Sequence, residues 1–252
     1  MKNQPTKKAV KQWQSDGRSH RIARLKTTQR RALPQLVELY LRISREDLIR
    51  AGIEMHGRAP NPAAARKLVV RTALHEAGHA VMARVATGTV PLLVTIERGS
   101  DQLEPGWGFT RVEPSLVQRL TTEQIEQLRN GAPAELFAQA IHLGAALDAM
   151  VFLAGPSADV LAQELAELPD LAGEDAPVPD CERARAVLAK VECDEEACAH
   201  WFTEVFEVTL AVLREPDVWA AVHSVAEALL NSPTLDEVRF AQFGTRKTKP
   251  MV

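Results

Sequence analysis

The 252-residue sequence is poor in cysteine and has no long apolar run, and each shortage excludes a class of protein. Its three cysteines are odd in number and include no CxxC pair, so they support neither a disulfide framework nor a thiolate zinc finger. The most apolar stretch, residues 137–162, is interrupted by Gln139, His142 and Asp148. It therefore falls short of the roughly 20 apolar residues that a membrane helix needs.

Two further signals are missing. The first 21 residues, "MKNQPTKKAVKQWQSDGRSHR", lack the apolar centre of a secretory signal. The GxxxxGK[ST] pattern of a phosphate-binding loop is also absent. We therefore expect a cytoplasmic protein without membrane insertion and without a nucleotide-driven module of its own.

The net charge is −3, but the charged residues are unevenly distributed along the sequence. Residues 1–32 hold ten Lys or Arg and a single acid, Asp16, which leaves 20 basic and 32 acidic residues for the remainder. A basic arm of this kind can bind nucleic acid or anionic lipid. Because Trp13 is its sole aromatic residue, a solvated tail is the simpler interpretation.

Hydrophobic periodicity predicts a mainly α protein with a small β-sheet, in the α+β class. Residues 1–66 form a basic extension that holds one amphipathic helix at about 34–51 and a linker, "HGRAPNPAAA". A single domain is expected over 67–245, followed by a flexible tail at 246–252.

Within that domain, a helix is predicted from about 66 to 86, with Gly88 placed to end it. The apolar, β-branched stretches at 90–99 and 106–113 are expected to be strands that pair. Further helices are predicted at 122–130, 133–165 with a break at Gly155-Pro156, 180–213 and 216–230.

The helix over 66–86 contains the sequence "HEAGH", which is an HExxH motif. On a helix, His75 and His79 lie about 40° apart around the axis, so both imidazoles can reach one metal ion. Glu76 lies about 60° from His79 on the same geometry and flanks the ion without binding it. A zinc hydrolase needs this arrangement, in which the ion lowers the pKa of a bound water and the carboxylate takes its proton.

Two histidines leave a tetrahedral zinc ion short of a third protein ligand. The spacing alone does not choose among the acids and histidines downstream. Asp180 follows Pro179 at the start of a predicted helix and also fits a helix N-cap, and the lone histidines also fit structural roles. The candidates are His142, Asp148, Asp170, Glu174, Asp175, Asp180, Glu182, His200 and His223.

The segment "HEAGHAV" at 75–81 resembles the motif helix of the FtsH-type zinc metallopeptidases, the proteolytic half of membrane-bound AAA proteases. The stretch "VTIERGSDQLEPGWGFTRVEP" at 94–114 is similar to that family's strand ending near Arg-Gly and its Gly-aromatic-Thr segment. "FLAGPSADVLA" at 152–162 resembles the Gly-Gly-Arg-Ala-Ala-Glu region, with Pro156 and Asp159 in place of the arginine and glutamate. "PDCERARAVLA" at 179–189 resembles the helix of the third ligand, and "HSVAEALLNSPTLDEVRF" keeps the order near the carboxyl end.

The resemblance, which covers roughly residues 70–245, implies a helical zincin-type peptidase domain. It implies the zinc ligands His75, His79 and Asp180, with Glu76 as general base. The ATPase half and the membrane segments of that family have no counterpart in this sequence. The expected function is a zinc-dependent endopeptidase that acts on flexible polypeptides without ATP, or with a separate unfoldase or adaptor.

We expect the substrate to bind as an extended strand along an edge formed by Val94, Thr95, Ile96 and Glu97. A homo-oligomer and a monomer are both compatible with the resemblance. The alternative hypothesis is a narrowly specific or catalytically retired peptidase fold that acts as a binding module, with the basic arm engaging nucleic acid or a protein partner.

Overall fold

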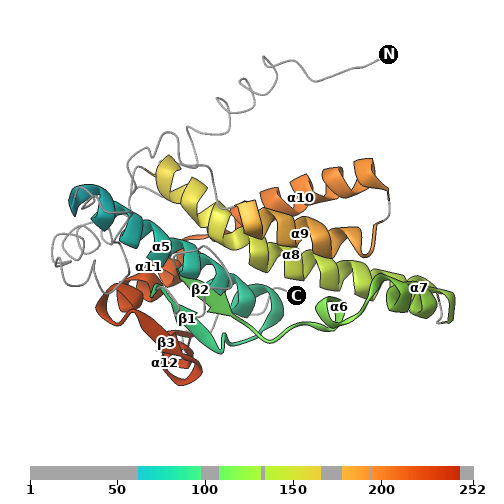
Figure 1. The fold of residues 1–252 in the computed structure, drawn as a ribbon, viewed down its shortest axis with the longest axis horizontal. Helices are drawn as coiled ribbons and strands as arrows, with labels where there is room; N and C mark the ends of the chain where they lie inside the picture. The colour runs from blue at the N-terminus through green and yellow to red at the C-terminus, as the bar shows by residue number, and fades with distance from the viewer. Residues whose placement is uncertain (1–61, 98–107, 132–133, 166–177, 193, 245–252) are drawn as a thin grey trace, which may run out of the picture.

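The computed structural model describes residues 62–97, 108–131, 134–165, 178–192 and 194–244. Within these residues the chain is mainly helical, with a small three-stranded antiparallel sheet (Figure 1). The expectation of an α+β fold is thereby confirmed. The predicted helix at 34–51, the basic arm and the tail at 246–252 lie outside the described residues.

The HExxH segment lies on helix α5, Pro62–Met82, which continues into the π-helical turn η1, Ala83–Thr87. The helix begins inside the predicted linker because proline is well suited to a first helical position, where its missing N–H is not needed. Gly88 ends the segment as predicted, with φ of 71° in the left-handed region that glycine adopts without strain.

The described helices that follow η1 are α6 (Leu116–Arg119), α7 (Thr122–Gly131), α8 (Ala134–Glu164), α9 (Val178–Ala189), α10 (Glu195–Leu213), α11 (Pro216–Asn231), α12 (Glu237–Ala241) and the 3₁₀ turn η2 (Gln242–Gly244). One long helix, α8, contacts α5, α6, α7, α9 and α10. The described helices include two regions that the sequence predicted to within a residue or two, α7 and α11.

Helix α8 runs through Pro156, so the predicted break at Gly155-Pro156 is wrong. A proline inside a helix removes one hydrogen bond and costs about 3 kcal/mol. Packing offsets this cost, because α8 contacts α5, α9 and α10, and Leu153, Ala154 and Ala158 on either side of the proline are fully buried.

The single helix predicted over 180–213 is two helices, α9 and α10. Asp194 is the N-cap of α10, since its carboxylate accepts a hydrogen bond from the backbone N–H of Ala197 at 2.8 Å. The chain therefore turns at this residue although it contains no glycine or proline there. An aspartate ahead of Glu195 and Glu196 is a signal for the start of a helix. The prediction missed it because the apolar pattern continues across this position.

The sheet has the order β2-β1-β3, with β1 at Leu93–Thr95, β2 at Phe109–Arg111 and β3 at Thr234–Asp236. The predicted pairing of the first two strands is confirmed, in a register that places Val94 opposite Thr110. Strand β3 was not predicted, because three residues between two helices give too short a pattern.

Strand β1 is the central strand, which overturns the prediction of an open edge along Val94–Glu97. Val94 pairs with Thr110 on one side and with Leu235 on the other. Beyond the strand, the N–H of Ile96 donates to the carbonyl of Pro233 at 2.9 Å, and the N–H of Glu97 donates to Oγ1 of Thr95 at 3.0 Å. A peptide cannot add to β1, because β2 and β3 already occupy both of its edges.

Two apolar clusters form the core, and α8 belongs to both. Its first half packs with α6, α7, α9 and α10, around residues such as Leu188 and Val205. Its second half packs against α5 and belongs to the cluster that also holds α11 and the sheet, around residues such as Leu74 and Trp219. The HExxH helix and α9 meet α8 where these clusters join.

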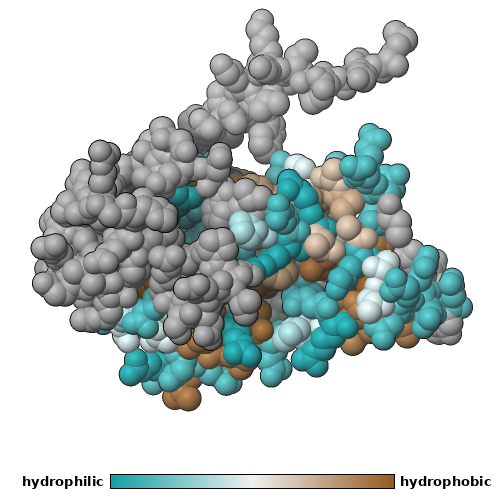
Figure 2. Space-filling view, in the orientation of Figure 1, coloured by the Kyte–Doolittle hydropathy of each residue, from teal (hydrophilic) through white to brown (hydrophobic). Residues whose placement is uncertain are grey.

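Part of α8, Ala138–Glu164, is long and apolar enough to cross a membrane by length and composition. Of its most apolar window, 72% is buried inside the protein, as in the core helix of a globular domain. The described surface visible in Figure 2 is mostly hydrophilic, with apolar side chains scattered between polar ones. The expected absence of membrane insertion stays a prediction.

Candidate metal centre

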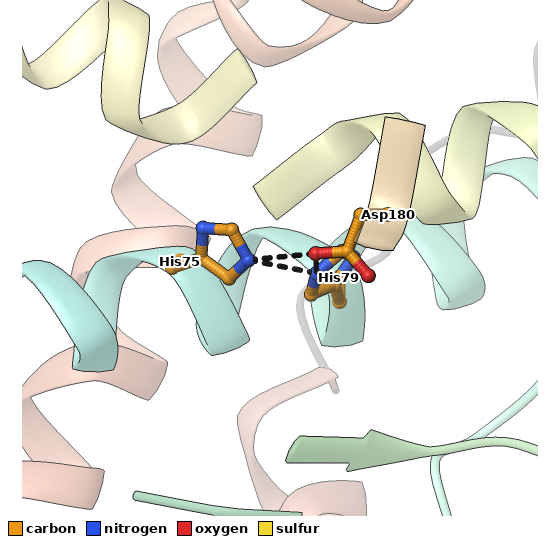
Figure 3. A group of neighbouring side chains, drawn as sticks. All are labelled: His75, His79 and Asp180. Atoms are coloured by element: carbon orange, nitrogen blue, oxygen red, sulfur yellow. Dashed lines mark hydrogen bonds and ion pairs between the residues drawn. The ribbon is translucent and has the colours of Figure 1, made fainter. Parts of the chain in front are cut away.

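Three side chains from two helices converge on one point in the core. His75 and His79 extend from α5, and Asp180 extends from the first turn of α9 (Figure 3). The Nε2 atoms of the two histidines are 3.2 Å apart. Oδ2 of Asp180 lies 3.0 Å from Nε2 of His75 and 3.3 Å from Nε2 of His79. The two nitrogens and one oxygen thus form a nearly equilateral triangle.

The dimensions of this triangle fit a tetrahedral zinc ion. Ligand atoms about 2.0–2.1 Å from such an ion lie about 3.3 Å from one another. The three donor-to-donor distances match that spacing, and a set of two imidazoles and one carboxylate is typical of catalytic zinc sites, which leave a fourth position open. The residues therefore suit zinc in both chemistry and geometry.

Both imidazoles are held in the orientation that metal binding requires. Nδ1 of His79 lies 2.7 Å from the carbonyl oxygen of Val151, which can only accept, so this nitrogen carries the hydrogen. Nδ1 of His75 lies 3.1 Å from Oδ2 of Asp159. Since both Nδ1 atoms donate, the two Nε2 atoms are left to face the centre of the triangle.

Asp159 is itself held by a second cation. Its Oδ2 accepts from Nε of Arg71 at 3.2 Å as well as from His75, and all three side chains are buried. Arg71 lies one turn before His75 on α5, so one helix supplies both donors to this carboxylate. The arrangement orients the His75 ring.

The backbone of α8 passes close to the centre. A Cβ atom built on Gly155 would lie 2.3 Å from Nε2 of His79 and 2.5 Å from Nε2 of His75. These are nearly the distances expected of a bound metal. The space between the imidazoles thus depends on the missing side chain of Gly155.

Glu76 is buried beside the two histidines and faces the sheet. Its Oε2 accepts a hydrogen bond from Oγ1 of Thr110, on β2, at 2.8 Å. Burial raises the pKa of Glu76, outweighing the charges of His79 and His75 and the bond from Thr110. A buried carboxylate with a raised pKa is a stronger base than one in water.

The structure brings together three of the residues proposed as ligands and leaves the other described candidates elsewhere. Asp180 lies within α9 rather than before its first residue, so it is not the N-cap that its position after Pro179 suggested. His142 stacks near Trp201, Asp148 accepts from Ser115, His200 pairs with Glu204 and His223 packs on Trp219. Glu182 is exposed, and Asp170, Glu174 and Asp175 lie outside the described residues.

The surroundings of His75 favour its protonated form. Burial lowers the pKa of His75, but the hydrogen bonds to Asp159 and Asp180, with the charges of Asp159 and Glu76, outweigh it and raise the pKa to about 10. Burial likewise opposes ionisation of Asp180, yet the bonds from His75 and His79 and their charge hold its pKa well below the usual range. The proton therefore resides on the imidazole between two carboxylates.

Zinc binding must displace that proton, so the apparent affinity is expected to depend on pH. Below a pKa of about 10, each unit of falling pH favours protonated His75 and weakens zinc binding about tenfold. We expect about one proton released per zinc ion near pH 7, measured with a pH indicator in weakly buffered solution. Substitution of the exposed His200 by alanine should leave this release unchanged, whereas zinc binding without proton release would contradict the assignment.

Four residues of the site were not identified from sequence: Arg71, Thr110, Gly155 and the supporting carboxylate Asp159. Arg71 could have been found, because it shares a face of α5 with His75. Thr110 and Asp159 lie in segments that resemble the peptidase family, but their partners are on other elements. In the sequence, Gly155 stands out only as part of a predicted helix break with Pro156, and its position next to the two imidazoles depends on the packing of α5 against α8.

Comparison with known proteins adds no assignment, because no protein-family profile and no curated protein matches this chain. The resemblance to FtsH-type peptidases rests on the motifs quoted above and stays a prediction.

Proposed function

We propose that this chain is a zinc-dependent endopeptidase of the helical zincin type, similar to FtsH-type peptidases. His75, His79 and Asp180 hold the zinc ion, and Glu76 is the general base. The observation that carries the proposal is the triangle of donor atoms with sides of 3.0–3.3 Å, whose imidazoles both use Nδ1 for other hydrogen bonds.

A bound zinc ion supplies a Lewis acid, which acidifies water and polarises a carbonyl group. The protein residues provide the proton transfer. Glu76 takes a proton from the attacking water and delivers it to the leaving amine, a task for which a buried carboxylate with a raised pKa is suited. Asp159 holds the ring of His75 in place through the reaction.

Strand β2 is the better candidate for the substrate edge. Among the described residues, it pairs only with β1, and its side chains Phe109 and Arg111 are exposed. Thr110, between them, contacts Glu76. An extended peptide added to the outer side of β2 therefore lies next to the general base.

Metal removal tests the proposal. We expect the zinc-loaded protein to cleave an unfolded substrate such as casein without ATP, and a zinc chelator to abolish the cleavage. A non-chelating isomer of the same compound serves as the control, and added zinc should restore activity. Cleavage that survives complete zinc removal would contradict the mechanism.

Failure of the zinc-loaded protein to cut any member of a panel of unfolded proteins would favour the alternative, a binding module with a retired site. Addition of a candidate unfoldase or adaptor then separates that outcome from dependence on a partner. A cytoplasmic location, nucleic-acid binding by the arm and homo-oligomer formation stay predictions.

A further inference from the structure

The hydroxyl group of Thr110 touches Glu76 at two points. Its Oγ1 lies 2.8 Å from the carboxylate oxygen Oε2 and 3.0 Å from the backbone carbonyl oxygen of the same residue. A threonine hydroxyl has one hydrogen and two lone pairs. It can therefore donate to either oxygen in turn, and it can also accept a hydrogen bond.

The sheet, rather than α5, fixes the position of this hydroxyl. Thr110 is the middle residue of β2 and pairs with Val94 in the central strand. Two residues earlier, Gly108 has φ of 85°, and a Cβ built on it would lie 3.0 Å from Cγ of Glu76 and 2.6 Å from the carbonyl oxygen of Thr95. Only glycine permits so close an approach of β2 to α5 with this backbone conformation.

We propose that Thr110 is a positioning residue that holds Glu76 in both of its protonation states, an inference that rests on the proposed function. While the carboxylate is ionised, the hydroxyl of Thr110 donates to Oε2. Once the other carboxyl oxygen, Oε1, has taken a proton from water, Oε2 is still an acceptor and Thr110 keeps donating to it. The new proton on Oε1 can then pass to the leaving amine.

Thr110 neither gains nor loses a proton in this exchange, and its hydroxyl stays 2.8 Å from Oε2. The carboxyl group thus keeps a partner of fixed position before and after proton transfer. Without it, Glu76 would be buried with a polar oxygen unpaired in one state or the other, and its side chain would leave the reacting position.

Two substitutions separate a catalytic effect from general loss of structure. Thr110→Val keeps the shape of the side chain and removes the hydroxyl, whereas Thr110→Ser keeps the hydroxyl. We expect Thr110→Val to lower kcat about 10–100-fold, as loss of a supporting hydrogen bond does elsewhere, with KM changed less than about threefold. The kcat of Thr110→Ser should stay within about threefold of that of the wild type. Zinc affinity should be unchanged in both variants.

A matched control is Thr209→Val in α10, where a buried threonine hydroxyl donates to the carbonyl of Val205 in its own helix at 2.7 Å. This variant should keep the kcat of the wild type. A Thr110→Val variant with unchanged kcat, or a Thr110→Ser variant as slow as Thr110→Val, would overturn the proposal.

A thermal double-mutant cycle provides a readout that does not depend on cleavage. The loss of Tm caused by Thr110→Val should fall by at least half when Glu76 is already alanine, because the carboxylate contact is then gone. Equal losses in both backgrounds would show that Thr110 does not act through the carboxylate and would overturn the inference. If the Tm cycle shows coupling but the wild-type protein cleaves no substrate, the contact between Thr110 and Glu76 is supported. The proposed function, and with it the catalytic role of Thr110, is then wrong.

Discussion

Replacing Gly155 with alanine is expected to prevent zinc binding while leaving the fold in place. The added Cβ would lie 2.3 Å and 2.5 Å from the two Nε2 atoms, far inside contact distance, so the imidazoles must move out of the positions that form the triangle. We expect the zinc affinity to fall at least about a hundredfold, since even the loss of an outer hydrogen bond costs about 10–100-fold.

The substitution is informative because alanine by itself stabilises a helix relative to glycine, whereas the expected effect on zinc binding is a loss. Alanine inside a helix is about 1 kcal/mol more favourable than glycine. The helix propensity of alanine therefore cannot cause a loss of zinc binding, whereas its clash with the two buried imidazoles can. Zinc affinity is measured by competition with a chromophoric chelator, and helix content by circular dichroism.

Gly144→Ala supplies the matched control on the same helix. A Cβ at that position meets Cγ2 of Val117 at 2.9 Å, a side-chain methyl group that can move, and no residue of the centre. This variant should bind zinc as the wild type does. If Gly155→Ala bound zinc as tightly as the wild type, the ion would lie elsewhere than between His75 and His79.

The contrast between His75 and Gly155 shows which parts of the site can be read from sequence. His75, Glu76 and His79 lie within five residues of one helix, so 3.6-residue geometry alone predicts their relative placement. The third proposed ligand, Asp180, is 105 residues from His75. Local periodicity gives no distance across such a separation, and Asp180 was selected from nine candidates only by resemblance.

The errors in predicting the fold have a common physical origin. Pro156 favours a break, and Val94–Glu97 looks like an edge, when each segment is considered alone. Contacts from distant residues decide otherwise, because α5 and α9 pack against α8 and β3 pairs with β1. The coarse α+β class was predictable, since it depends only on the periods of the individual segments.

The second large effect is expected from Glu76→Gln, which should lower cleavage by about a hundredfold to ten-thousandfold. Glutamine has nearly the same volume, and its carbonyl oxygen can still accept a hydrogen bond from Thr110. What it loses is the ability to take a proton from water. Zinc affinity should stay close to that of the wild type, because Glu76 is not among the three residues that surround the centre.

Activity and zinc content must therefore be measured on the same preparation. Loss of cleavage with full zinc content separates the general base from the ligands, whose removal should lower both together. Gly155→Ala should behave like loss of a ligand, and Glu76→Gln should not. If Glu76→Gln cleaved casein at the rate of the wild type, the base would have to be another residue, and the link from Thr110 to catalysis would fail with it.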